Sequence, residues 1–146
     1  MDLIVKLENL PKENSLPGIA IRRSTREEFD KVLCWIEAHF DQGWANETSV
    51  GFFTNPISIF IATENEIILG FAAYECTAPG FLGPIGVIEA RHNQGIGRAL
   101  LLQALQGLSE IGYLHAVIHD VGDAVNFYQH VLGDCIVATI PEANPE

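Results

Sequence analysis

One stretch decides the fold of this chain: Val87-Ile88-Glu89-Ala90-Arg91-His92-Asn93-Gln94-Gly95-Ile96-Gly97-Arg98, continuing into Ala99-Leu100-Leu101-Leu102. It predicts the end of a strand, a short loop with two glycines, and the first turn of a long amphipathic helix. Gly95 and Gly97 leave the backbone uncovered where the helix begins. A helix N-terminus offers unpaired N–H groups and about half a positive charge. The stretch therefore predicts a binding site for a phosphate or pyrophosphate.

The composition is that of one globular domain. The chain has 146 residues, of which 48% are hydrophobic. No apolar run is long enough to span a membrane, and the N-terminus lacks the pattern of a secretion signal, so we predict no membrane partner. Cys34, Cys76 and Cys135 are widely spaced and odd in number, which indicates reduced thiols and a cytoplasmic protein.

The charge is strongly acidic. Eight basic residues stand against 19 acidic ones, giving a net charge of −11. A nucleic-acid surface needs a basic patch, so we predict no nucleic-acid partner. The charge is compatible with attracting a cationic substrate such as an amine, although acidic surfaces commonly serve solubility alone.

The rest of the chain predicts alternating strands and helices, with residues 19–140 as a single domain. Residues 1–18 form an N-terminal extension, in which a loose alternation over residues 2–10 predicts an extra edge strand. Residues 141–146 are a polar tail. Expected strands cover residues 19–22, 57–63, 67–76, 81–87, 113–118 and 135–140. Expected helices run from a cap at Ser24 or Thr25 to about residue 40, and over 46–53, 96–111 and 124–131, the last capped by Asp123.

The strand over residues 81–87 has an unusual composition. Gly83, Pro84 and Gly86 weaken the hydrogen-bond ladder of a strand in the middle of a sheet. Such residues often mark a bulge, or a place where a ligand runs close to the backbone.

These elements together resemble the GNAT superfamily of acetyl-CoA-dependent N-acyltransferases. Its central motif is Arg or Gln, two residues, Gly, one residue, then Gly or Ala, and it corresponds here to residues 92–97. Its downstream motif, Ala-x-x-x-Tyr on a short helix, corresponds to residues 124–128. The resemblance covers about residues 19–140. It implies an α+β fold, with a mixed, mostly antiparallel sheet of about six to seven strands, flanked by about four helices and splayed at the CoA site.

The resemblance also implies the residues that bind acetyl-CoA as cosubstrate. His92 stands where the family has Arg or Gln, with Arg91 beside it. The backbone cradle does not depend on that side chain. The expected CoA-binding residues are Ile85, Val87, His92, Asn93, Gln94, Gly95, Ile96, Gly97 and Arg98.

Acetyl transfer to an amine needs a polarised thioester carbonyl, a neutral nitrogen and a proton for the leaving thiolate. The splayed strand end at residues 86–87 could present N–H donors to the developing oxyanion. The resemblance implies Tyr128 as general acid, and a phenol with a pKa near ~10 suits a thiolate of comparable basicity. His119, beside Asp120, is a candidate base or acceptor contact, and Glu75 is a second candidate base.

Several further assignments stay open in the sequence. Asp41 could flank the acceptor site, Glu89 could cap the loop, and water could relay the proton. Trp44 and the pair at residues 52–53 could line the acceptor entrance or simply pack against the sheet. His115 and His119 share a strand face without a third ligand, so we predict no metal. Homodimerisation through the N-terminal or last strand is compatible with exposed sheet edges.

Three functions are compatible with these residues. The favoured one is a cytoplasmic N-acetyltransferase that moves acetyl from acetyl-CoA to a primary amine of a small molecule by direct attack. No cysteine sits on a motif position, so no acyl-enzyme is expected. The alternative is a sensor of CoA or acyl-CoA with little turnover, suggested by His92. A nucleotide-binding domain is the third, but neither common nucleotide-binding glycine motif is present.

Overall fold

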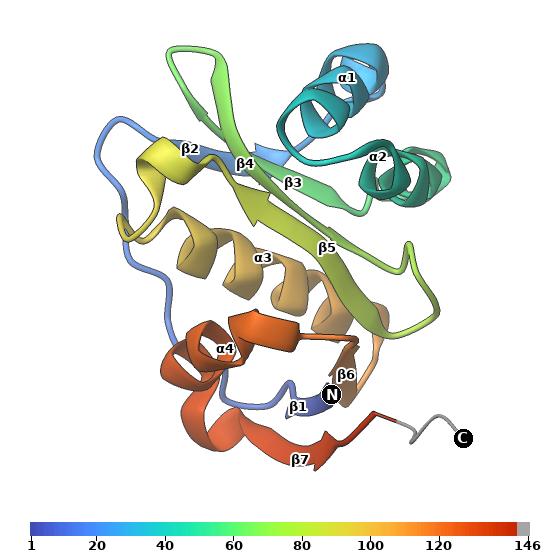
Figure 1. Ribbon diagram of the computed structural model, residues 1–146, viewed down its shortest axis with the longest axis vertical. Coiled ribbons are helices and arrows are strands. Elements are labelled where there is room, and N and C mark those ends of the chain that lie inside the picture. Colours follow the sequence, from blue (N-terminus) through green and yellow to red (C-terminus); the bar gives the residue numbers. More distant parts are fainter. Residues whose placement is uncertain (143–146) are drawn as a thin grey trace.

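The computed structural model describes residues 1–142, in which a seven-stranded sheet carries helices on both faces (Figure 1). The strands are β1 (Asp2–Lys6), β2 (Ala20–Arg23), β3 (Ile59–Glu64), β4 (Ile67–Tyr74), β5 (Phe81–Val87), β6 (His115–Ile118) and β7 (Ile136–Ile140). The helices are α1 (Phe29–His39), α2 (Gln42–Ser49), α3 (Ile96–Ile111) and α4 (Val125–Leu132). No helix among these residues is long and apolar enough to cross a membrane. Of the predicted polar tail, residues 143–146 lie outside the described part.

The sheet order is β2-β3-β4-β5-β6-β1-β7, and every described pair is antiparallel except β5 with β6. The predicted fold class is therefore confirmed. Side chains alternate between two cores: Ile59 and Ile61 pack under α1 and α2, whereas Phe60 and Ala62 pack with α3 on the other face. This is the period of two that a strand buried on both faces requires.

The predicted N-terminal strand exists, but its predicted place at a sheet edge is wrong. β1 lies between β6 and β7 and pairs antiparallel with both. Leu3 and Val5 are fully buried, which a strand covered on one face and paired on both sides explains. Because both edges of β1 are already paired, two copies of the chain cannot dimerise by strand pairing through β1. On that side of the sheet β7 is the edge, and pairing through it stays a prediction.

Two helix starts differ from the sequence-based expectation. α2 begins at Gln42, four residues before the predicted start, because the Asp41 side chain caps it by accepting a hydrogen bond from the backbone N–H of Trp44 at 2.7 Å. Asp123 does not cap α4. It lies in a 3₁₀ turn, Gly122–Ala124, whose backbone leads directly into the helix.

The predicted bulge in β5 is confirmed. Ala72 faces Ile85 on one side of it and Tyr74 faces Leu82 on the other, so two β5 residues oppose one β4 residue between them. β5 pairs with β6 only at Phe81 and Leu82. Beyond Leu82 the two parallel strands separate, and the sheet opens at the bulge.

The turn before α1 carries a charged cap that makes stability depend on pH. Glu28 accepts hydrogen bonds from the Arg22 guanidinium at 2.8 and 2.9 Å and from the Thr25 backbone N–H at 2.8 Å. The Arg22 contact, with Thr25 and Ser24, lowers the pKa of Glu28 to about 2. This carboxylate therefore stabilises the fold above its unfolded pKa of about 4.3, and the contribution is lost as pH falls toward 2.

We expect Glu28→Gln to lower the melting temperature at pH 7, with a difference from wild type that shrinks below pH ~4.3. Thermal unfolding followed by circular dichroism between pH 2.5 and 7 measures this. Glu27→Gln removes an exposed carboxylate next to it and serves as the control. If the melting temperatures of wild type and Glu28→Gln differ by the same amount at every pH, the lowered pKa of Glu28 would be contradicted.

Candidate active site

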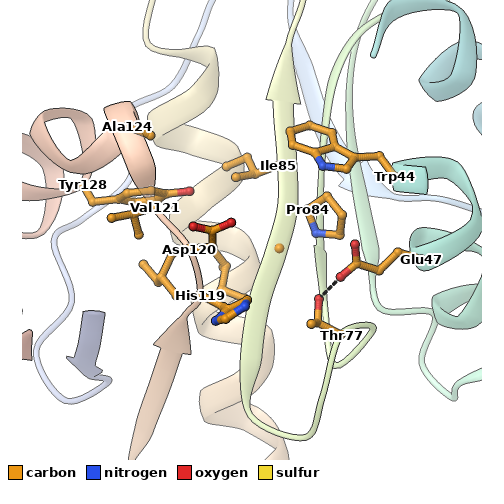
Figure 2. A pocket seen from close by; sticks show the side chains of 13 residues that line it. Trp44, Glu47, Thr77, Pro84, Ile85, His119, Asp120, Val121, Ala124 and Tyr128 are labelled. Carbon is orange, nitrogen blue, oxygen red and sulfur yellow. Dashed lines mark hydrogen bonds between the residues drawn. The ribbon is translucent and has the colours of Figure 1, made fainter. Parts of the chain in front are cut away.

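A cleft of about 270 Å³ opens where β5 leaves β6. Figure 2 shows its two sides: Tyr128 and the end of β6 lie on one side of β5, and α2 lies on the other. The polar and aromatic side chains that line it are Trp44, Glu47, Thr77, His119, Asp120 and Tyr128. The structure thus brings together two of the three predicted catalytic residues.

Tyr128 is held on α4 with its ring buried and its hydroxyl directed toward β5 (Figure 2). Only 6% of the residue is exposed, and burial raises the pKa of its phenol to about 12. The hydroxyl makes no hydrogen bond within residues 1–142, yet it borders the cleft. A phenol in this setting keeps its proton at neutral pH and can donate it to a group bound in the cleft.

The open edge of β5 offers backbone groups to the gap. The N–H of Ile88 bonds to the carbonyl of Leu69 on β4 at 2.9 Å. Since backbone groups alternate between the two edges of a strand, Ile85 and Val87 direct theirs away from β4, on the side where β6 has separated. These are the two β5 residues that the sequence predicts as cofactor contacts.

The predicted glycine cradle lies at the start of α3. Gly95 has a φ of +86° as the residue before the helix, and Asn93 has a φ of +63°. The helical ladder begins with the N–H of Ala99 bonding to the carbonyl of Gly95. The N–H groups of residues 96–98 therefore have no intrahelical partner, as an anion site requires.

Three side chains around the cradle bond to neighbouring groups of the protein. The His92 ring turns back to β5, where its Nε2 donates a hydrogen bond to the Val87 carbonyl at 2.8 Å. Arg91 pairs with Glu64 at 2.8 Å, and its Nε donates to Gln94 at 2.8 Å. Arg98, in the first turn of α3, makes no hydrogen bond or ion pair within the described residues. It is therefore the basic side chain left for a phosphate.

Gly97 separates α3 from α4. A Cβ atom added there would lie 3.4 Å from the ring of Phe127. The same Cβ would lie 3.7 Å from Cγ2 of Val87, so a larger side chain would have to fit between Phe127 and Val87 beside the first turn of α3.

The candidate bases separate clearly in space. His119 lines the cleft at the end of β6. Glu75 does not: its carboxylate accepts a hydrogen bond from the backbone N–H of Gly80 and is hydrogen-bonded to Tyr113, whose pKa it raises. Asp41 serves as the cap of α2, and Glu89 begins a short 3₁₀ turn before the cradle. Of the candidate bases, His119 is thus the one that lines the same cleft as Tyr128.

Sequence reasoning missed Glu47, Thr77 and the partner of His119. Glu47 accepts a hydrogen bond from the Thr77 hydroxyl across the cleft wall (Figure 2). Trp44 and Glu47 are three residues apart on α2, so a helix begun at the Asp41 cap would have placed both on one face. His119 contacts Asp2, 117 positions earlier, and no local signal indicates that contact. In the described residues no group of three His, Cys, Asp or Glu side chains could hold a metal ion.

The comparisons with known proteins agree with this geometry. A family model described as an acetyltransferase (GNAT) domain matches residues 55–131, which is more than half of the 146 residues. That match contains the hairpin, the cradle and Tyr128. Comparison with curated protein sequences finds no match.

Solved structures share the fold at low identity. They include a glucosamine N-acetyltransferase region of a fungal multi-domain GH3 β-N-acetylglucosaminidase, with 16% identity, 89% of this chain covered and a TM-score of 0.71. A GCN5-related N-acetyltransferase from Sphaerobacter thermophilus has 19% identity, 89% coverage and a TM-score of 0.71. This chain spans 19% and 46% of those two chains. An aminoglycoside N-acetyltransferase in complex with CoA has 14% identity and a TM-score of 0.64, with 94% of this chain and 98% of that chain covered.

Proposed function

Because this chain belongs to the GNAT acetyltransferase family, we propose that it transfers an acetyl group from acetyl-CoA to a primary amine of a small-molecule acceptor. One observation carries the proposal. The gap between β5 and β6 contains a protonated, buried phenol and an imidazole, and the cradle at the start of α3 follows directly from β5. The pyrophosphate of acetyl-CoA would bind at the cradle, and its thioester would lie beside β5, near the phenol and the imidazole.

The chemistry follows from what each group can do. The amine nitrogen attacks the thioester carbon directly, forming the C–N bond, while the N–H groups of Ile85 and Val87 are the donors available to the developing oxyanion. His119 accepts the proton that the nitrogen loses. The C–S bond then breaks, and the sulfur takes a proton from Tyr128. Return of the proton to the phenolate through solvent restores the enzyme.

The cleft also favours a class of acceptor. Its charged side chains are the carboxylates of Glu47 and Asp120, and no Lys or Arg lines it among the described residues. Trp44 adds an aromatic face. An acceptor with a second ammonium group, in addition to the amine that reacts, would be attracted by both carboxylates and could stack on the indole. We therefore propose an acceptor with at least two amino groups, such as a diamine or an amino sugar that carries several amino groups, rather than a monoamine.

The proposal is tested by CoA release from acetyl-CoA, followed with a thiol reagent, over a panel of amines. The panel pairs each diamine with the monoamine of the same chain length. We expect amine-dependent release with higher kcat/KM for the diamines. Equal kcat/KM values within the pairs would contradict the proposed acceptor class, and the absence of any amine-dependent release would contradict the transferase itself.

His92 and Arg91 favour one alternative function. His92, the first residue of the motif, is hydrogen-bonded to the Val87 carbonyl, and the Arg91 guanidinium beside it is paired with Glu64. A cradle without a free cation at this position could hold CoA as a sensor that turns over slowly. Tight binding of CoA in calorimetry, with no transfer to any amine of the panel, would establish that reading.

Binding at the cradle yields a separate prediction. Gly97→Glu would place a carboxylate beside the unpaired N–H groups of α3, where it competes with and repels a pyrophosphate. We expect CoA affinity to fall by about tenfold or more, or ~1.4 kcal/mol. Gln106→Glu adds the same charge on an exposed position of the same helix and is the control. Titration calorimetry that gives both variants the same Kd would rule out the cradle as the pyrophosphate site.

A further inference from the structure

The N-terminal strand reaches the candidate active site. β1 runs antiparallel to β6, with Leu3 opposite Ile118, so the first residues of the chain lie beside the end of β6, where the cleft opens. The carbonyl of Met1 accepts a hydrogen bond from the N–H of Val121 at 3.0 Å. Figure 1 shows the N-terminus next to β6, below α3. Residues 1–3 and 118–121, far apart in the sequence, therefore build this wall together.

The carboxylate of Asp2 makes two contacts with that wall. Its Oδ1 lies 3.0 Å from Nδ1 of His119 and accepts a hydrogen bond from the N–H of Asp120 at 2.9 Å. The Asp120 N–H and the His119 ring hold the pKa of Asp2 below its usual value. Asp2 is therefore ionised at neutral pH and can only accept hydrogen bonds.

This contact fixes the chemistry of the imidazole. An ionised carboxylate at Nδ1 requires the ring proton to be on that nitrogen, which leaves the lone pair on Nε2. Nε2 makes no hydrogen bond within residues 1–142, and His119 lines the cleft.

The same oxygen holds the backbone beside the ring. Asp120 has a φ of +52°, a left-handed conformation that residues other than glycine rarely adopt. The bond from its N–H to Asp2 stabilises that conformation, and Figure 2 shows its carboxylate directed to the Tyr128 side of β5. Asp2 thus sets both the tautomer of His119 and the turn that carries the ring into the cleft.

We infer that Asp2 is a positioning residue for His119, and that it holds the imidazole with Nε2 free to accept the proton of the attacking amine. The inference rests on the proposed acetyl transfer. The amine nitrogen loses its proton to Nε2 as the C–N bond forms, and the thiolate leaving from the C–S bond takes a proton from Tyr128. Asp2 touches neither substrate and acts through the ring.

The kinetic test compares Asp2→Ala and Asp2→Asn with wild type, with any purification tag placed after residue 146. We expect Asp2→Ala to lower kcat by about tenfold or more while the KM for acetyl-CoA stays unchanged. Asp2→Asn keeps an acceptor oxygen and should restore part of that loss. Asp134→Ala removes an exposed carboxylate outside the cleft and should leave kcat unchanged. Equal kcat for wild type and Asp2→Ala would overturn the inference.

A double-mutant cycle separates positioning from general stabilisation. In a His119→Gln background, Asp2→Ala should cause no further loss of kcat, since there is no imidazole left to orient. A full additional loss in that background would show that Asp2 acts only through the fold, and would overturn the inference.

The tautomer of His119 gives a readout that does not require turnover. In ¹⁵N-detected NMR, with the signal assigned by its loss in His119→Gln, wild type should show the proton on Nδ1. Asp2→Ala should shift the ring toward the Nε2–H form. The same tautomer in both proteins would overturn the inference even if the enzyme is active. Absence of transfer by wild type to any amine would instead reject the proposed function, and with it the role of His119 as base.

Discussion

Replacing Tyr128 with phenylalanine is expected to lower kcat for acetyl transfer by about 10²- to 10⁴-fold. The change removes the hydroxyl and leaves the buried ring, so packing of α4 against the sheet persists. Burial raises the pKa of this phenol to about 12, above the value near ~10 expected from sequence, so it stays protonated throughout the neutral pH range and gives up its proton only as negative charge develops on the leaving sulfur. Steady-state CoA release measures the loss, and the Kd for acetyl-CoA should remain that of wild type.

Tyr113→Phe is the matched control for this variant. Tyr113 packs against Gly80 in the turn between β4 and β5, and it does not line the cleft. It should keep nearly wild-type kcat. If Tyr128→Phe and Tyr113→Phe had the same kcat as wild type, Tyr128 would be a packing residue and water would have to protonate the thiolate.

Phe71→Ala is expected to lower the free energy of unfolding by about 3–5 kcal/mol. Phe71 is fully buried, with ring centroids 6.2 Å from Trp35, 5.9 Å from Phe40 and 6.0 Å from Trp44. Loss of its ring leaves a cavity under α1 and α2, and α2 carries the cleft residues Trp44 and Glu47. Chemical denaturation monitored by Trp fluorescence and circular dichroism measures the change.

Phe53→Ala provides the comparison, because that ring is 70% exposed. It should cost less than about 1 kcal/mol, as is usual for surface substitutions. Equal losses for the two variants would mean that the aromatic cluster beneath α1 and α2 is not a close-packed core.

Local patterns in the sequence predict most of the fold. The spacing of leucines in α3, the Thr25 to Glu28 cap and the glycines of β5 each act over a few residues, and the structure confirms the helix, the cap and the bulge. The position of β1 in the sheet cannot be predicted from such local patterns. Alternation shows that Leu3 and Val5 face a core, but an edge strand and an internal strand have the same alternation. Only pairing with residues more than a hundred positions away decides between them.

The candidate site divides in the same way. Gly95, Gly97 and Tyr128 lie on motifs and are found from sequence. Asp2 and Glu47 are not, because their roles depend on which distant segment folds beside them. His119 belongs to both groups. Its position at a strand end marks it as a candidate base in the sequence, but its contact with Asp2 becomes apparent only once β1 is placed beside β6.

The most direct test of this account is a crystal structure of the full chain with CoA bound. We expect the pyrophosphate oxygens to accept hydrogen bonds from the N–H groups of residues 96–98, and the pantetheine to pass between β5 and β6. The sulfur should lie within hydrogen-bonding distance of the Tyr128 hydroxyl, with His119 facing the acceptor side. CoA bound with its pyrophosphate away from the α3 N-terminus, or with its sulfur out of reach of Tyr128, would contradict the account.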